Sequence, residues 1–308
     1  MQKGVKMKKE LKFQNGRFKI MQFTDLHYVD GSSVDEKTIN LMRSLLAVEK
    51  PDFVMITGDT VYGVDNLQGL ERVLEPLVEA EIPWSFVFGN HDAEEGVGKE
   101  VLFKKVMDMP GSMVFHAEDS GFGIGNHYLE IKNDNYETEW VLFGVDSGSY
   151  NVLSDIGGYD YIREEQIRWY RKAIKELGVS YSDFASLLFL HIPLPEYKEV
   201  WERKGCIGKK LEEVCCPAVN SGFFTALLEE GHTKGVFAGH DHINDYIGNL
   251  HGIQLGYGRA TGYNTYGREG FLRGARVILL EEKNKNCFET YLRLEDGSIT
   301  SAVEICTE

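Results

Sequence analysis

The sequence predicts an α/β fold, because runs typical of buried strands alternate with runs typical of amphipathic helices. Residues 17–24 alternate like a strand, and residues 52–57 and 84–88 are short apolar runs. Residues 35–49 and 66–80 place apolar side chains at helical spacing between them. The order strand, helix, strand, helix, strand is typical of a parallel sheet with crossover helices.

The remaining elements follow less regularly. Pro76 is expected to kink or shorten the second helix, since proline donates no backbone hydrogen bond. Further strands are expected at residues 113–117, 126–132, 139–145, 186–190 and 234–238. Helices are expected at 163–177 and at 221–230, the latter with Ser221 at its N-cap. Alternation over 275–281 and 287–294 indicates antiparallel strands that close a second sheet.

The charge of the chain limits its partners. The 308 residues include 33 Lys and Arg and 48 Asp and Glu, which gives a formal net charge of −15. Charge attraction to long nucleic acids or to anionic membranes is therefore not expected. A small phosphorylated substrate remains compatible with this charge, because a bound metal can reverse the local sign.

Cysteine usage and the N-terminus predict a cytoplasmic protein. No run of about 18 apolar residues is present, and residues 1–13 are basic without an apolar signal core. The number of cysteines is odd, two are adjacent, and no Cys-x-x-Cys occurs. This pattern favours reduced thiols over a disulfide framework or a zinc ribbon. The cysteines are Cys206, Cys215, Cys216, Cys287 and Cys306.

Polar clusters directly follow five of the expected strands. A single Gly-Asp or His after a strand is usually a turn residue, but five such clusters in order are hard to explain as turns. Ligands in α/β folds bind beyond the carboxyl ends of strands, so the clusters are expected to converge on one site. They are Asp25-Leu26-His27, Gly58-Asp59, Gly89-Asn90-His91-Asp92, His191 and Gly239-His240-Asp241-His242.

The donor types in these clusters suit two metal ions. Residues i and i+2 of an extended chain point the same way, so Asp25 with His27, and His240 with His242, can each present two donors to one place. Carboxylate, amide and neutral imidazole donors suit manganese, iron or zinc. The candidate ligands are too many for one tetrahedral ion and suit two ions that share a carboxylate, as in phosphoryl displacement.

These motifs resemble the calcineurin-like metallophosphoesterase superfamily. Residues 191–197 (HIPLPEY), 220–224 (NSGFF) and 239–245 (GHDHIND) are similar to its purple-acid-phosphatase-like branch. The resemblance implies a four-layer α/β/β/α sandwich of two mixed β-sheets flanked by helices, with a dimetal site at the strand ends. It implies a single domain over residues 1–308, in which 1–15 form an N-terminal extension or an edge strand.

The resemblance also implies roles for individual residues. His91 would contact the phosphate or protonate the leaving group, and Asp92 could orient that imidazole. One metal would be held by Asp25, His27 and His242, the other by Asn90, His191 and His240, with Asp59 bridging them.

One position departs from the pattern of true purple acid phosphatases. They have Gly at the position of His27 and use a Tyr three residues after the bridging Asp, where this chain has Tyr62. Because His27 is present, we expect it to be the ligand and Tyr62 to be a wall residue. Metal ligation by Tyr62 is the alternative.

The resemblance implies a phosphoric ester hydrolase, either a phosphatase or a phosphodiesterase, in which a metal-activated hydroxide attacks phosphorus in line. Two divalent or mixed-valence ions of manganese, iron, zinc or nickel would be its cofactors. The alternatives are a nuclease, or a metal-binding scaffold or regulatory protein with little turnover. The expected partner is a small phosphorylated substrate, and the oligomeric state is left open.

Two loops are candidates for substrate contact. Residues 256–268 are rich in Gly, Tyr and Arg, and arginine matches phosphate oxygens with its forked donors. The alternative is a structural turn region with packed tyrosines. Residues 92–99 form an acidic loop, either a mobile rim or, as we favour, a solvated connection. The candidate substrate residues are Arg259, Tyr263, Tyr266 and Arg268.

Overall fold

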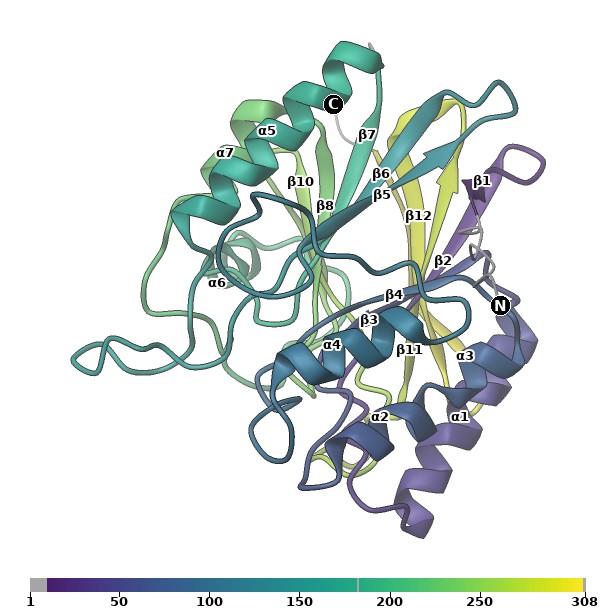
Figure 1. Ribbon diagram of the computed structural model, residues 1–308. Helices are drawn as coiled ribbons and strands as arrows, with labels where there is room; N and C mark the ends of the chain where they lie inside the picture. The colour runs from purple at the N-terminus through teal and green to yellow at the C-terminus, as the bar shows by residue number, and fades with distance from the viewer. Residues whose placement is uncertain (1–9, 182, 307–308) are drawn as a thin grey trace, which may run out of the picture.

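The computed structural model describes residues 10–181 and 183–306, and it contains two mixed β-sheets with helices outside them (Figure 1). The six-stranded sheet has the order β13 (Ile299–Cys306), β12 (Asn284–Leu294), β11 (Gly274–Glu281), β2 (Arg17–Phe23), β3 (Phe53–Thr57), β4 (Trp84–Val87). The seven-stranded sheet has the order β1 (Leu11–Lys12), β5 (His127–Lys132), β6 (Thr138–Gly144), β7 (Ala185–Phe189), β8 (Thr233–Ala238), β10 (Ile253–Tyr257), β9 (Ile247–Leu250).

The strand and helix order expected in the N-terminal third is confirmed. Strands β2, β3 and β4 are parallel neighbours, joined by α1 (Ser33–Glu49) and by α2 (Asn66–Val73) with α3 (Glu75–Glu79). The helix expected at 66–80 is divided, because Pro76 lies in the first turn of α3, where a missing backbone N–H costs least.

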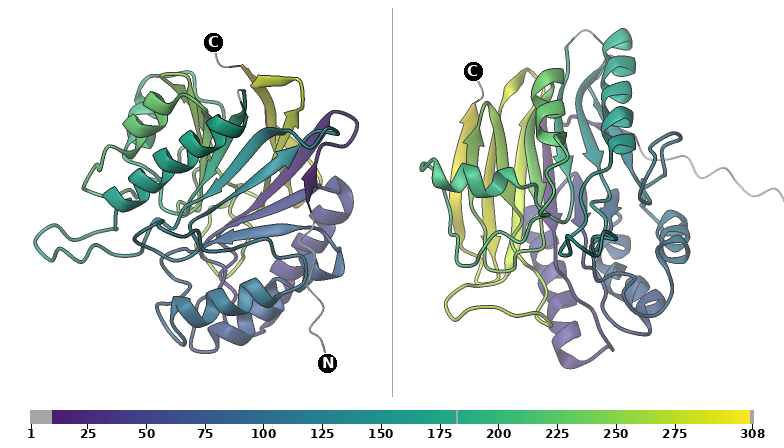
Figure 2. Two further views of the ribbon diagram at one scale, coloured as in Figure 1. Left: turned by 45° about the horizontal axis from the view of Figure 1, so that its top comes forward. Right: turned by 90° about the vertical axis from the view of Figure 1, so that its left-hand side faces the viewer.

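Side chains on both faces of the sheets are buried, which produces four layers. In β2 and β3, Met21 and Val54 pack toward α1 and α2, while Ile20 and Phe53 pack against the other sheet beside Trp140. On the far face of the seven-stranded sheet lie α5 (Glu164–Ser180), α6 (Glu196–Glu202) and α7 (Phe223–Glu230). Figure 2 shows α5 and α7 on one side of the strands and α1 to α3, with α4 (Lys99–Asp108), on the other. The expected four-layer fold is confirmed.

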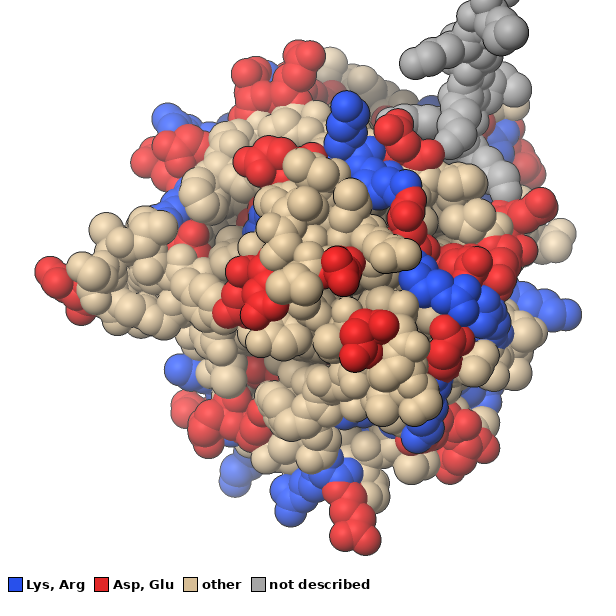
Figure 3. Space-filling model, turned by 60° about the horizontal axis from the view of Figure 1, so that its bottom comes forward, with Lys and Arg blue, Asp and Glu red and all other residues tan. Residues whose placement is uncertain are grey.

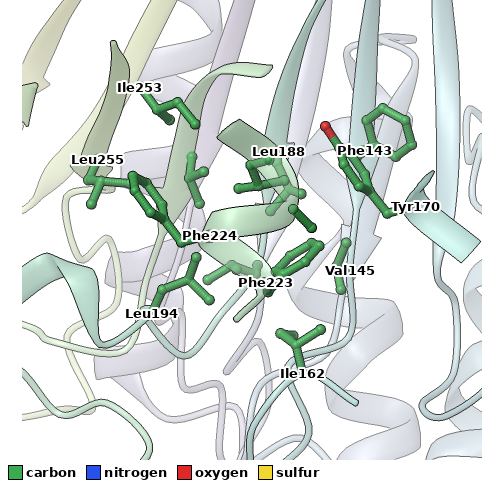
Figure 4. Close-up of a cluster of buried hydrophobic side chains, with 14 of the residues drawn as sticks. Phe143, Val145, Ile162, Tyr170, Leu188, Leu194, Phe223, Phe224, Ile253 and Leu255 are labelled. Atoms are coloured by element: carbon green, nitrogen blue, oxygen red, sulfur yellow. The ribbon is translucent and has the colours of Figure 1, made fainter. Parts of the chain in front are cut away.

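Apolar side chains form the contact between α7 and the sheet. Phe223 and Phe224 project from α7 toward Leu188 and Leu255 of the sheet and Leu194 of the preceding loop (Figure 4). The helix begins after Gly222, which has φ of 79°, rather than with the expected Ser221 at the N-cap.

Several short elements differ from expectation. Residues 113–117 contain no strand, although a bridge joins the adjacent Ser112 to Trp84. No expected element corresponds to α4, α6, β9, β10 or β13. The strands among them are held by pairing with their neighbours, β9 and β10 with each other and β13 with β12.

The ends of the described chain bear on three expectations. Residues 11–12 form an edge strand parallel to β5, as one of the two alternatives for residues 1–15 anticipated, whereas residues 1–9 lie outside the described residues.

Cys287 and Cys306 oppose each other on β12 and β13 and form a disulfide, so the expectation of reduced thiols was wrong for this pair. In the described part of the chain, no helix is long and apolar enough to cross a membrane.

Candidate metal centre

The carboxyl ends of five strands from both sheets meet at one place. Strands β2, β3 and β4 end there from one sheet, and β7 and β8 end there from the other. The approach is close enough to require glycine at position 58, where a Cβ would lie 2.6 Å from Gly89 N and from His191 Nδ1. Gly58 also has φ of 80°, which side chains disfavour.

A first group of potential ligands lies at the ends of β2, β3 and β8. Ligand atoms of Asp25, His27, Asp59 and His242 all lie within 4.8 Å of one another, and all four side chains are buried. His27 Nε2 lies 3.6 Å from Asp59 Oδ2, and His242 Nε2 lies 3.4 Å from Asp25 Oδ1. These separations leave room for an ion between the donors.

A second group shares Asp59 with the first. It contains His191 and His240, and His191 Nε2 lies 3.2 Å from Asp59 Oδ2. Asn90 belongs beside it, because its Oδ1 is 3.2 Å from the same nitrogen. The structure thus brings together all seven expected ligands, with Asp59 between the two groups.

Unpartnered atoms point to what these groups hold. His27 Nε2, Asp59 Oδ2 and His240 Nε2 are buried without a hydrogen-bond partner. Buried polar atoms are nearly always paired, so three unpaired polar atoms at one place indicate a binding site for a ligand. Carboxylate and imidazole donors at this spacing fit metal ions, and the two groups sharing one carboxylate fit two of them.

Neighbouring groups orient the imidazoles. His191 Nδ1 donates to the Thr57 carbonyl at 2.8 Å, which leaves Nε2 facing Asp59. Thr265 Oγ1 contacts His242 Nδ1 and turns Nε2 toward Asp25. Such outer contacts fix the ring and its tautomer for metal binding.

Backbone strain marks the same residues. Asp25, His27, Asp59 and His240 have positive φ angles of 54°, 47°, 47° and 76°. Non-glycine residues seldom adopt this region, and such strain gathers at functional sites. It turns the side chains of the strand ends inward.

Charges at the centre are arranged for ligation. Burial lowers the pKa of His27 to about 4 and that of His240 to about 3, so both imidazoles are neutral near pH 7. Burial alone would raise the pKa of Asp59, but His191 and His27 hold it well below its usual range. The Asp59 carboxylate outweighs burial at His191 and raises its pKa to about 9, so ligation of a metal by His191 is expected to release a proton.

His91 stands at the rim of the centre rather than among the ligands. Its side chain is 30% exposed, and its backbone N–H donates to Asp59 Oδ1 at 2.8 Å. Its Nδ1 contacts Glu94 Oε2, and its ring centroid is 5.3 Å from that of Tyr62. Tyr62 therefore lies against His91, whereas His27 lies within the first ligand group.

The expected contact between Asp92 and His91 is not formed. The buried Asp92 carboxylate instead accepts hydrogen bonds from the backbone N–H groups of Thr60, Val61 and Gly89 at 2.7, 3.0 and 2.7 Å. It therefore ties together the loops that follow β3 and β4. Burial, and then the charge of Asp59, raises the pKa of Asp92 to about 6. The partner of His91 is Glu94, three residues along the chain, which the sequence analysis missed.

The four candidate substrate residues within residues 256–268 differ in burial and in their contacts. Arg259 is 3% exposed, pairs with Asp245 and stacks on Phe271, so it is not free for substrate. The Tyr263 hydroxyl donates to Glu295, a structural contact. Tyr266 does border the centre, with its ring centroid 4.2 Å from that of His242. Arg268 is exposed, and its role stays a prediction.

A hairpin missed in the sequence analysis also borders the centre. Residues 149–160 project from the molecule (Figure 1), with Tyr150 and Tyr159 paired at the base. The Tyr159 ring centroid lies 4.3 Å from that of His240, and the Tyr150 hydroxyl lies 3.4 Å from Asn90 Nδ2. Nothing in the sequence alone placed these tyrosines near the ligands.

Known proteins are similar to this chain in sequence and in fold. The family model described as calcineurin-like phosphoesterase matches residues 18–244. The chain is 34% identical to "Probable inactive purple acid phosphatase 14" of Arabidopsis thaliana, over 88% of this chain and 77% of that one. It is 33% identical to "Phosphatase DCR2" of Saccharomyces cerevisiae, over 75% of this chain and 45% of that one. A dimetal phosphatase from Danio rerio has the same fold, with a TM-score of 0.64 at 13% identity, covering 94% of this chain and 99% of that one. The chain belongs to the calcineurin-like phosphoesterase family, and within it is similar to the purple acid phosphatases.

Proposed function

We propose that this protein hydrolyses phosphoric esters with two metal ions bound at the candidate metal centre. The observation that carries the proposal is Asp59, whose buried Oδ2 has no hydrogen-bond partner and is shared by both ligand groups. The similarity to proteins named as phosphatases supports the same reaction. Manganese, iron, zinc and nickel are all compatible with carboxylate, amide and imidazole donors.

The residues of the chain have separate tasks in this reaction. Metal ions held by the seven ligands would neutralise the phosphate and make a water nucleophilic near neutral pH. Because Glu94 engages Nδ1 of His91, Nε2 is the nitrogen left to donate a proton to the departing alcohol oxygen. Asp92 keeps His91 in place indirectly, through the backbone on either side of it.

A binding or regulatory role is the main alternative, and the name of the Arabidopsis relative, which calls that protein inactive, favours it. The complete ligand set and the His91–Glu94 contact of this chain favour turnover. A nuclease is disfavoured by the net charge of −15. The cytoplasmic location stays a prediction. The Cys287–Cys306 disulfide weighs against it, since disulfides persist mainly in oxidising compartments.

The test measures hydrolysis of para-nitrophenyl phosphate and bis-para-nitrophenyl phosphate by protein stripped of metal and refilled with each ion. Metal content is recorded in parallel. We expect turnover that requires metal, and a loss of about 10²–10⁴ in kcat for His91→Ala with metal content unchanged. Two bound metals without turnover on either ester or on a metabolite panel would overturn the proposal and favour the binding role.

A further inference from the structure

An aromatic and acidic rim surrounds His91. Tyr62 lies on one side, with ring centroids 5.3 Å apart, and Glu94 contacts Nδ1 on the other. The Tyr150 hydroxyl lies 3.3 Å from Glu94 Oε1 and 3.4 Å from Asn90 Nδ2. We call Tyr62, Glu94 and Tyr150 the leaving-group rim. The three side chains are accessible, since Tyr62 and Tyr150 are 39% and 46% exposed and the Glu94 side chain is 36% exposed.

The position of this rim assigns it to one part of the substrate. In the proposed function, on which this inference rests, the phosphate lies at the metal centre and the alcohol departs toward His91. The side chains around His91 therefore face the alcohol, not the phosphate. Their chemistry indicates which alcohols the site accepts.

Lysine and arginine do not contribute to the leaving-group rim in the described part of the chain. Among the described residues, no lysine or arginine makes a hydrogen bond, an ion pair or a cation–π contact with His91, Tyr62, Tyr150 or Glu94. The nearby Lys99 is paired with Asp146. The hairpin 149–160 has only acidic charges, and it forms the mostly uncharged projection at the left of Figure 3.

We propose that the leaving-group rim selects phosphate monoesters whose alcohol carries a positive charge, such as a primary amine or a quaternary ammonium group. Tyr159 stacks on one face of Tyr150, so a cation is attracted by the π electrons of Tyr62 and of the other Tyr150 face, and the Glu94 carboxylate adds charge attraction. An alcohol with a carboxylate or a second phosphate meets repulsion from Glu94 and finds no arginine or lysine. In the reaction, water adds to phosphorus as the P–O bond to the alcohol breaks, and the departing oxygen takes up a proton. The products are inorganic phosphate and the free alcohol, which keeps its cationic group.

The test compares three esters that differ mainly in charge. Phosphocholine carries a cation, 3,3-dimethylbutyl phosphate is its neutral isostere, and phosphoglycolate carries an anion. We expect kcat/KM to fall in that order, about tenfold between cation and isostere, which equals about 1.4 kcal/mol. Glu94→Gln and Tyr150→Leu should reduce the preference in kcat/KM for phosphocholine over its neutral isostere to about threefold or less. Tyr150→Phe keeps the aromatic ring and should retain the preference. Glu118→Gln removes an exposed carboxylate elsewhere and is the matched control.

A second measurement does not depend on activity. Saturation-transfer NMR detects weak binding of tetramethylammonium, with 2,2-dimethylpropanol as the neutral comparison. We expect a signal for the cation that Tyr62→Leu and Tyr150→Leu each weaken. Equal rates on all three esters, or equal binding of both probes, would overturn the inference while leaving the proposed function standing if para-nitrophenyl phosphate is hydrolysed. If no ester is hydrolysed, the proposed function fails, and the NMR comparison still decides whether the rim binds cations.

Discussion

Asp59 connects the two ligand groups, so its replacement by Asn is the sharpest perturbation of the centre. The carboxylate lies 3.2 Å from His191 Nε2 and 3.6 Å from His27 Nε2, and its buried Oδ2 has no hydrogen-bond partner. Asparagine preserves the shape but removes the charge that both ions would share. We expect Asp59→Asn to lose at least one of two bound metals.

The magnitude follows from linkage between binding and folding. A metal that binds only the folded chain stabilises it by about 2.7 kcal/mol at roughly 100 times its Kd. For a chain of this size, that is an upward shift of the melting temperature of about 5 °C per site. The wild type should show this shift on adding manganese or zinc, and Asp59→Asn should lose most of it.

The assay is differential scanning calorimetry with and without metal, together with metal content by mass spectrometry. The metal-induced shift is compared rather than the melting temperature alone, because the variant also removes the carboxylate charge beside His191. Asp134→Asn, in an exposed turn, is the control and should retain the full shift. An Asp59→Asn protein that binds two metals with the wild-type shift would refute the assignment of Asp59 as the shared ligand.

Three further predictions concern stability away from the centre. Phe223→Ala should lower the free energy of unfolding by about 3–5 kcal/mol in urea, because the side chain is 1% exposed between α7 and the sheet. Cys287→Ser should cost about 3 kcal/mol by opening a loop of 19 residues to Cys306, and an unchanged urea midpoint would contradict a disulfide there. Burial alone would raise the pKa of Glu49, but hydrogen bonds from neighbours including Arg293 lower it. The Glu49 carboxylate therefore stabilises the folded chain above the unfolded pKa of 4.5, and this contribution is lost as the pH falls through the lower pKa of the folded state. Glu49→Gln should thus lower the free energy of unfolding by about 1.5–3 kcal/mol at pH 7 and by much less at pH 3.

The parts of the fold with strong periodicity were predictable. The β2, β3 and β4 strands and α1 were evident because both faces of the strands are buried and the helix spacing runs over several turns. Strands β9 and β10, and β13 at a sheet edge, were not evident, since pairing with neighbours stabilises them more than their own pattern.

The seven candidate ligands were also found from the sequence, because each follows a strand and parallel strands end at one edge. The surroundings of His91 were not, since they depend on contacts that no spacing encodes. Glu94 reaches His91 through the conformation of a turn, and Tyr150 reaches Glu94 from 56 residues away. Likewise, Arg259 was a plausible phosphate ligand until packing placed it against Asp245. Local patterns along the chain were enough to identify the ligand types, whereas the partners of each side chain were set by which distant segments the packed sheets bring together.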